Sequence, residues 1–197
     1  MRQRGFSLIE LMVTVTILTL LILMAMPSLG TWLDNTRIRN EGDSIITGLQ
    51  SARSAAVSSN QNVSFWLVGS AATPGNPGDD CALSGSSGSW VVSVASPVGH
   101  CAGWLTSSPP QILLSRSMGS DNARVSISAV QSDGTTAATT VTFNGFGRVV
   151  NATPIAQVNL NGSGGGTYRQ LRVVVSATGA VRMCDPLVTS STDPRKC

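Results

Sequence analysis

Charged side chains are scarce in this sequence, where they make up 12% of 197 residues, and aromatic side chains reach only 5%. Glycine is plentiful, with 20 residues, and serine and threonine are abundant. This composition is typical of an extracellular β-rich domain rather than a cytosolic enzyme. Two of the 13 basic residues, Arg2 and Arg4, precede Gly5. A chain cleaved after Gly5 would keep 11 basic residues against 10 acidic ones, so bulk charge does not indicate nucleic-acid binding.

Motifs of catalysis and metal binding are also missing. No Gly-x-Ser-x-Gly nucleophile motif occurs, and the glycine-rich run from Gly162 to Gly166 has no lysine or following helix that would make it a phosphate site. No loop spacing supports calcium binding at Asp79 and Asp80. The acidic residues Asp79, Asp80, Asp121, Asp133, Asp185 and Asp193 fall in turn-like stretches, where Asp is favoured for local backbone bonding. We therefore predict no enzymatic activity, no cofactor and no metal.

The four cysteines are Cys81, Cys101, Cys184 and Cys197. An even number at long spacings in an exported domain indicates two disulfides, for which three pairings exist. We favour Cys81 with Cys101 and Cys184 with Cys197, because each pair closes a polar, turn-rich segment of modest length, a closure that stabilises by about 3 kcal/mol. A zinc site that includes His100, the single histidine, is the disfavoured alternative, because no Cys-x-x-Cys or His pair supplies a local chelate.

The N-terminal thirty residues contain a long apolar segment. From Leu8 to Met26 it is apolar except for Glu10 and three threonines, which is about the length that crosses a bilayer as a helix. Arg2 and Arg4 precede it, so the positive-inside rule places the N-terminus in the cytoplasm and the remainder outside. A cleaved secretory signal would have a shorter apolar region and a small-x-small end. A plain anchor leaves Glu10 unexplained, because an unpaired carboxylate in hydrocarbon costs at least about 2.5 kcal/mol.

The run Gly5-Phe6-Ser7-Leu8-Ile9-Glu10 resembles the prepilin peptidase motif of type IV pilins and type II secretion pseudopilins. The resemblance implies that a prepilin peptidase cleaves after Gly5 and that Phe6 becomes the N-methylated N-terminal residue. It also implies that Glu10 pairs with the N-terminal amine of a neighbouring subunit. A buried carboxylate is tolerable when an opposite charge and hydrogen bonds compensate its lost hydration. Pro27 falls where pilins commonly carry a helix-bending proline.

Beyond the apolar segment, the pattern predicts a longer helix and then strands. Between Thr31 and Ser59 apolar residues recur at helical spacing, at Ile38, Ile45, Leu49, Ala52 and Ala56, so this stretch continues the helix with one face on a sheet. Gly42 and Gly48 weaken the helix and indicate a flexible stretch. After Asn60 short β segments follow: 63–67, 90–94, 112–114, 125–129, 140–143, 155–160, 171–176 and 181–184. Turn-forming runs separate them, and no second long helix is predicted.

Two C-terminal segments, VTFNGFGRVV and LRVVVSATGAVRMC, resemble signatures of the GspH/FimT/FimU group of minor pilins and pseudopilins, whose head has two antiparallel sheets. Gly145 and Gly147 predict a turn with positive φ after which Arg148 starts a strand, and Thr178-Gly179 predicts a two-residue hairpin turn. FimT members implicated in DNA uptake carry Gly-Arg-x-Arg, whereas this chain has Ala180 in place of the first arginine. The candidate DNA-binding residues are Arg182, Arg195 and Lys196, with Arg169 and Arg172 on the preceding strand. The missing arginine and the two-disulfide tail are more similar to FimU members, which prime assembly at the pilus tip.

The predicted fold class is therefore α+β, a type IV pilin fold with a long N-terminal helix on an antiparallel β head. We expect a leader at 1–5, a transmembrane and filament-core helix at 6–30, an amphipathic continuation at 31–60 and a β-rich head at 61–197. The expected protein is a minor type IV pilin of a Gram-negative bacterium. It would be held in the inner membrane before joining other minor and major pilins at the tip or initiation complex. The alternatives are a DNA-binding minor pilin for transformation and a GspH-type pseudopilin of type II secretion.

Overall fold

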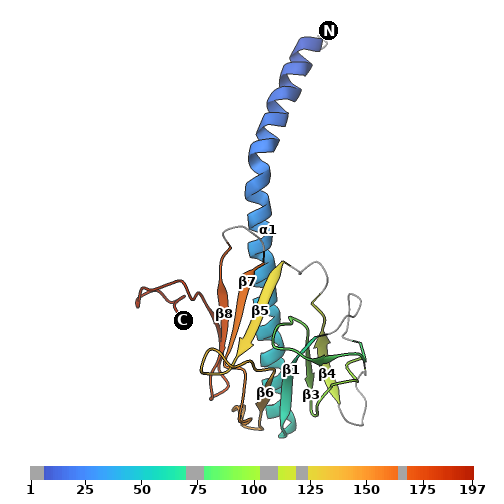
Figure 1. The fold of residues 1–197 in the computed structure, drawn as a ribbon, viewed down its shortest axis with the longest axis vertical. Coiled ribbons are helices and arrows are strands. Elements are labelled where there is room, and N and C mark those ends of the chain that lie inside the picture. Colours follow the sequence, from blue (N-terminus) through green and yellow to red (C-terminus); the bar gives the residue numbers. More distant parts are fainter. Residues whose placement is uncertain (1–6, 70–77, 103–110, 119–123, 164–167) are drawn as a thin grey trace, which may run out of the picture.

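The computed structural model describes residues 7–69, 78–102, 111–118, 124–163 and 168–197, except for the side chains of residues 24–29. A single helix, α1 (Leu8–Ser59), runs through 52 residues. Ser7 caps its first turn by accepting a hydrogen bond from the Glu10 amide at 3.3 Å. Asn60 ends it in the left-handed conformation, at φ 50°, where its amide bonds to the Ala56 carbonyl. The first half of α1 projects from the head as a stalk, and the second half lies against the strands (Figure 1).

The head consists of two antiparallel sheets, as the resemblance to the GspH/FimT/FimU group implied. The first has the order β2-β1-β3-β4, with β6 also pairing β1, and the second has the order β5-β7-β8-β9. The strands of the first sheet are β1 (Val63–Gly69), β2 (Ala82–Leu83), β3 (Trp90–Ser93), β4 (Ile112–Arg116) and β6 (Thr140–Phe143). Those of the second are β5 (Val125–Val130), β7 (Gln157–Gly162), β8 (Leu171–Val175) and β9 (Val181–Cys184).

Strand ends differ from the predictions in several places. The short strand β2 was not predicted, because its two residues are both exposed and carry no alternating pattern. β4 and β5 extend beyond the predicted 112–114 and 125–129, while β3 and β8 end one residue early. β7 begins at Gln157 rather than at the predicted Ile155. Ile155 is fully buried, which explains its strand-like appearance, but its amide bonds to the Thr140 carbonyl at 3.0 Å outside any ladder.

The core lies between α1 and the inner faces of both sheets. The predicted apolar stripe is confirmed, because Ile38, Ile45, Leu49, Ala52 and Ala56 are all completely buried. They belong to one cluster with residues from both sheets, among them Phe65, Phe143, Leu160 and Val173. Burying one large apolar side chain contributes about 1.5–3 kcal/mol, so the helix face is a main part of the stability of the head.

Gly42 and Gly48 lie where the sheets approach the helix closely, rather than marking a flexible stretch as predicted. A Cβ at Gly48 would lie 2.7 Å from Cε2 of Phe65 and 2.9 Å from Cδ2 of Trp90. A Cβ at Gly42 would lie 2.6 Å from Cε of Met183 on β9. At Gly48 the low helix propensity of glycine is therefore offset by close packing against two rings of the first sheet, whereas at Gly42 the neighbour is the flexible end of a side chain.

Two predicted turns need correction. At the turn after β6, Gly147 has φ +71° but Gly145 does not share this conformation, and Arg148 starts no strand, since Val149 makes only an isolated bridge to Phe143. The connection between β8 and β9 is longer than the predicted two-residue hairpin. The Ser176 amide bonds to the Ala180 carbonyl at 3.0 Å, so three residues lie between them, and the last, Gly179, has φ +81°. This is the three-residue type of hairpin, whose third residue is left-handed.

Candidate assembly interface

The first half of α1 exposes an unusual amount of apolar surface. Twelve large apolar side chains between Leu8 and Leu23 are 48–77% exposed: Leu8, Ile9, Leu11, Met12, Val13, Val15, Ile17, Leu18, Leu20, Leu21, Ile22 and Leu23. They surround the helix on every side, whereas a surface helix of a soluble domain has one apolar stripe. An exposed apolar area of this extent indicates a surface that another molecule or a membrane covers.

The polar groups of this segment differ in how they are satisfied. The hydroxyls of Thr14, Thr16 and Thr19 each donate to a backbone carbonyl three or four residues earlier, at 2.8–3.0 Å. These threonines therefore need no partner outside the helix. The carboxylate of Glu10 is exposed, and it has no hydrogen bond or ion pair among the residues that the structure describes. Glu10 is thus the one acidic group of an apolar segment and has an unused capacity for a cationic partner.

The predicted processing residues, Gly5 and Phe6, lie outside the described residues. The helix begins at Leu8, two residues after Phe6, and the side chain of Ser7 caps its first turn by accepting a hydrogen bond from the Glu10 amide. A search of the described helical residues finds no stretch that is both long enough and apolar enough to cross a membrane.

The structure pairs Cys81 with Cys101 and Cys184 with Cys197, the pairing that we favoured. The first disulfide is buried beside β1 and β3, in a small cluster with Val68, Val91 and Ile112. His100 is exposed next to it, and no cluster of metal-binding side chains occurs in the described part of the chain. The second disulfide ties the C-terminal residue to the end of β9, and the backbone of Lys196 bridges to Asp185 beside it.

The candidate DNA-binding residues are brought together but are engaged within the protein. Arg182 donates to the carbonyl oxygens of Lys196 and Cys197, both at 3.1 Å. Arg195 forms two hydrogen bonds with the Asp193 carboxylate, at 3.0 and 2.7 Å. The hydrogen bonds from Arg195 lower the pKa of Asp193 from its ordinary 3.8 to about 2, so this carboxylate remains charged. Lys196 is exposed, the Arg182 guanidinium ties the C-terminal segment to β9, and the Arg195 guanidinium bonds within that segment.

The arginines of the preceding strand region also have internal partners. Arg172 donates to the side-chain oxygen of Asn159 on β7 at 2.7 Å. Arg169 lies 3.5 Å from the Asp185 carboxylate, and its amide donates to the side chain of Asn35 on α1 at 2.8 Å. Arg169 therefore joins the helix, the second sheet and the C-terminal segment, which the sequence did not indicate.

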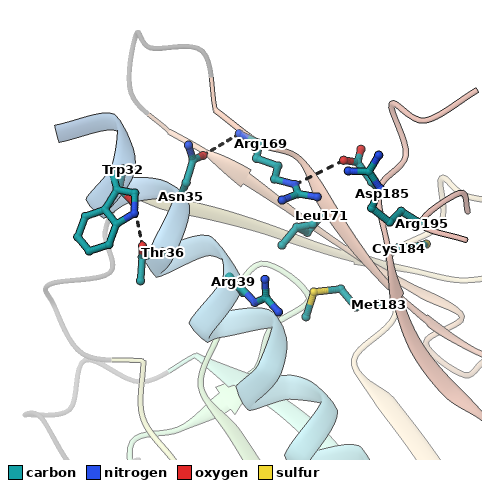
Figure 2. A pocket seen from close by; sticks show the side chains of 10 residues that line it. All are labelled: Trp32, Asn35, Thr36, Arg39, Arg169, Leu171, Met183, Cys184, Asp185 and Arg195. Carbon is teal, nitrogen blue, oxygen red and sulfur yellow. Dashed lines mark hydrogen bonds and ion pairs between the residues drawn. The ribbon is translucent and has the colours of Figure 1, made fainter. Parts of the chain in front are cut away.

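A groove of about 500 Å³ lies where α1 meets β8, β9 and the C-terminal segment (Figure 2). Leu171 and Met183 form an apolar part of its lining, and Trp32, Arg39 and Arg169 surround them. The Trp32 side chain is 63% exposed, although tryptophan usually buries most of its large apolar surface. The sequence patterns did not single out Trp32, although a tryptophan that directly follows a long apolar segment is typical of the interface between membrane and water.

Near this groove, a buried acid fixes the helix to the second sheet. Asp34 is only 4% exposed, and its carboxylate lies 2.8 Å from Arg37 and 3.3 Å from Arg124, the residue before β5. Two guanidinium groups compensate the loss of hydration at this carboxylate. The helix face also contains the fully buried Glu41, which an apolar-stripe analysis does not reveal.

Comparison with known proteins places this architecture. The family model described as type II transport protein GspH matches residues 41–179, and the prokaryotic N-terminal methylation motif matches residues 1–26. This chain belongs to the GspH family. It is accordingly a membrane-anchored member of the minor pilin and pseudopilin group. The GspH match covers α1 from Glu41 to its end and most of the head, while β9 and the C-terminal disulfide lie beyond its end.

Two solved structures are similar to this GspH-family chain, both of the type IV minor pilin FimU from Pseudomonas aeruginosa. One has 14% sequence identity and a TM-score of 0.49, covering 77% of this chain and 91% of the other. The second crystal form has 16% identity and a TM-score of 0.42, covering 74% and 90%. A search of curated proteins finds no match.

Proposed function

We propose that this chain is a structural, non-enzymatic minor type IV pilin that joins the tip or initiation complex and promotes pilus assembly. The observation that carries the proposal is the exposed apolar half of α1 with Glu10 as its single acid. A filament core of packed helices would cover the apolar side chains that the isolated chain exposes. Family membership supports a role as a filament subunit. The position of this subunit at the pilus tip or initiation complex is the part that we propose.

The role of Glu10 follows from electrostatics. Cleavage after Gly5 by a prepilin peptidase would create an amine at Phe6, which N-methylation leaves positively charged. In the apolar filament core a carboxylate and a cation attract each other strongly, whereas either one alone is costly. Pairing of Glu10 with the Phe6 amine of a neighbouring subunit would therefore set the axial register of otherwise featureless apolar helices.

Before assembly, the chain would be a single-pass protein of the inner membrane, with its N-terminus in the cytoplasm and its head in the periplasm. The proposed span, Leu8 to Met26, extends into residues 24–29, whose side chains lie outside the described set. The two disulfides support an oxidising location for the head.

A clean deletion of the gene tests the proposed role, with surface piliation and twitching motility as readouts. We expect both to fall and to return with the wild-type gene. Complementation with Glu10→Ala should fail, although the protein is processed and stable. Complementation with Thr14→Ala is the matched control and should succeed, because the Thr14 hydroxyl bonds only within its own helix. Normal pili in the deletion strain would contradict the proposal.

Secretion is the second candidate, because the matching family is described as type II transport protein. A GspH-type pseudopilin would use the same helix and Glu10 in a different machine. In that case the deletion would leave pili intact and abolish export of secreted enzymes. The genomic neighbourhood, either minor-pilin genes or a secretion operon, separates the two candidates without an experiment on the protein.

DNA binding is a weaker candidate, because Arg182 and Arg195 are engaged with carbonyl and carboxylate oxygens and Ala180 stands where DNA-uptake members have arginine. Binding through phosphate contacts weakens steeply with salt. Gel-shift titrations of the full chain in detergent, at low and raised salt, test it. A salt-sensitive shift that Arg182→Ala and Arg195→Ala abolish would favour a DNA receptor over a purely structural pilin.

A further inference from the structure

The end of the head from which the stalk emerges has a cluster of exposed cationic and aromatic side chains. We define the collar as Trp32, Arg37, Arg124 and Arg169. Trp32 and Arg37 come from α1, while Arg124 precedes β5 and Arg169 precedes β8. The strands β5 and β8 both reach this end of the head beside the helix (Figure 1).

The collar is held at one level along α1 by contacts to consecutive helix residues. The guanidinium group of Arg124 contacts the Asp34 carboxylate at 3.3 Å, and the amide of Arg169 bonds to the Asn35 side chain at 2.8 Å. Figure 2 shows Trp32 and Asn35 on the helix, with the backbone amide of Arg169 bonded to Asn35 and the Arg169 guanidinium directed toward Asp185. Two separate segments of the second sheet therefore place an arginine near the same turn of the helix.

The arginines of the collar are more exposed than the carboxylates with which they pair. The side chains of Arg37, Arg124 and Arg169 are 37%, 65% and 48% exposed. Their acidic partners, Asp34 and Asp185, are 5% and 13% exposed. Among the described residues, these two carboxylates are thus turned inward, and the accessible side chains of the collar are three arginines and the exposed indole of Trp32.

The level of the collar along the stalk matches the edge of a bilayer. At 1.5 Å per residue, a hydrocarbon layer of about 30 Å takes roughly 20 residues, which from Leu8 reaches residue 27. Trp32 lies about 7 Å further, within the headgroup layer, where tryptophan is enriched in membrane proteins. The three arginines of the collar lie about one helical turn beyond Trp32, and long arginine side chains can extend back to a headgroup.

We propose that, before assembly, the collar docks the head on anionic phospholipid headgroups of the membrane that holds the helix. Arg37, Arg124 and Arg169 would contact lipid phosphates while the indole of Trp32 lies among the headgroups. Charge complementarity identifies the partner, because outward guanidinium groups suit phosphates and an exposed indole suits the interface between water and acyl chains. This docking rests on the proposed membrane-embedded stalk, and it would fix the orientation of the head for delivery to the filament.

The test uses the full chain in nanodiscs made from phosphatidylethanolamine and phosphatidylglycerol. After gentle delipidation, native mass spectrometry measures the ratio of the two lipids that remain bound. We expect phosphatidylglycerol to be enriched over the nanodisc composition, by about five-fold for each arginine that holds a headgroup. Arg124→Gln with Arg169→Gln should bring the ratio close to the bulk value. Arg116→Gln with Arg148→Gln, which removes two exposed arginines outside the collar, should leave it unchanged.

Quenching of Trp32 provides an independent readout that does not depend on charge. Lipids with a spin label on the headgroup should quench wild-type fluorescence more than lipids labelled at the end of the acyl chain, and Trp32→Phe should remove this difference. Equal lipid ratios in both double variants, together with no headgroup quenching of Trp32, would overturn the collar proposal. Loss of pilus assembly in Arg124→Gln with Arg169→Gln at an unchanged lipid ratio would assign the collar to a protein partner instead. Release of the chain from nanodiscs by alkali would contradict the proposal that the stalk is embedded in the membrane. This outcome is therefore distinguishable from a failure of the collar proposal alone.

Discussion

Replacement of Gly48 by alanine should destabilise the head, although alanine is the better helix former. The new methyl group would lie 2.7 Å from Phe65 Cε2 and 2.9 Å from Trp90 Cδ2. Both rings are buried, they contact each other with centroids 5.7 Å apart, and the Trp90 indole donates to Ser44 at 3.0 Å, so neither can move freely. Overpacking of this kind costs about 1–3 kcal/mol, and two rigid ring contacts favour the upper half of that range.

Helix propensity opposes this cost, because a glycine-to-alanine change within a helix gains about 1 kcal/mol. The net loss for Gly48→Ala is therefore about 1–2 kcal/mol. For a protein of this size each kcal/mol shifts the midpoint by about 2–4 °C, so Tm should fall by roughly 2–8 °C. The assay is thermal unfolding of the full chain in detergent, followed by near-UV circular dichroism of the buried aromatic residues.

Gly42 and Gly30 provide matched controls on the same helix. At Gly42 the nearest atom is the terminal methyl of Met183, which can change rotamer at small cost, so Gly42→Ala should be neutral or stabilising. At Gly30 a Cβ meets nothing within 4 Å, and Gly30→Ala should leave the head unaffected. A Tm of Gly48→Ala equal to or above that of Gly42→Ala would refute the reasoning. If ring contact is the cause, the penalty should also shrink in a Phe65→Leu background.

Three further predictions concern the polar contacts. Asp34→Asn should lower the free energy of unfolding by about 1.5–3 kcal/mol, because it removes a buried charged acceptor. Arg124→Gln, which changes a mostly exposed partner, should lower it by less than about 1 kcal/mol. Denaturant titrations measure both values, and equal losses would contradict this reasoning. Hydrogen bonds from the Thr136 hydroxyl and from the amides of Thr135 and Thr136 lower the pKa of Asp133 from 3.8 to about 2. Its stabilising effect should therefore be complete above about pH 5 and lost as the pH falls through 2; an NMR titration midpoint near 3.8 would exclude these bonds. Non-reducing peptide mapping should find Cys184 joined to Cys197, and a crossed pairing would disprove the assignment. Replacing both cysteines by serine should lower the free energy of unfolding by up to about 3 kcal/mol and speed amide hydrogen exchange in residues 195–197.

Some features of the protein follow from the sequence alone, because they depend on local order along the chain. The processing motif, the apolar segment with Glu10 and the helical spacing from Ile38 to Ala56 are all patterns within a few turns of one element, and the family match and the burial of the stripe agree with them. The antiparallel β head was also predictable, since eight of the nine strands among the described residues carry an alternating or β-branched pattern between turns. Its division into two sheets was implied by the resemblance to the GspH/FimT/FimU group.

The tertiary structure decided what depends on residues distant in sequence. The sequence could not reveal that Gly42 and Gly48 face Met183, Phe65 and Trp90, because only the approach of the sheets gives those positions a packing role. Arg182 looked available for a ligand until the folded C-terminal segment supplied its acceptors, the carbonyl oxygens of Lys196 and Cys197. Arg124 and Arg169, which are 45 residues apart, each contact the same turn of α1 because β5 and β8 lie in the same sheet and reach the same end of the head. Such juxtapositions arise from chain topology, and local patterns contain no information on it.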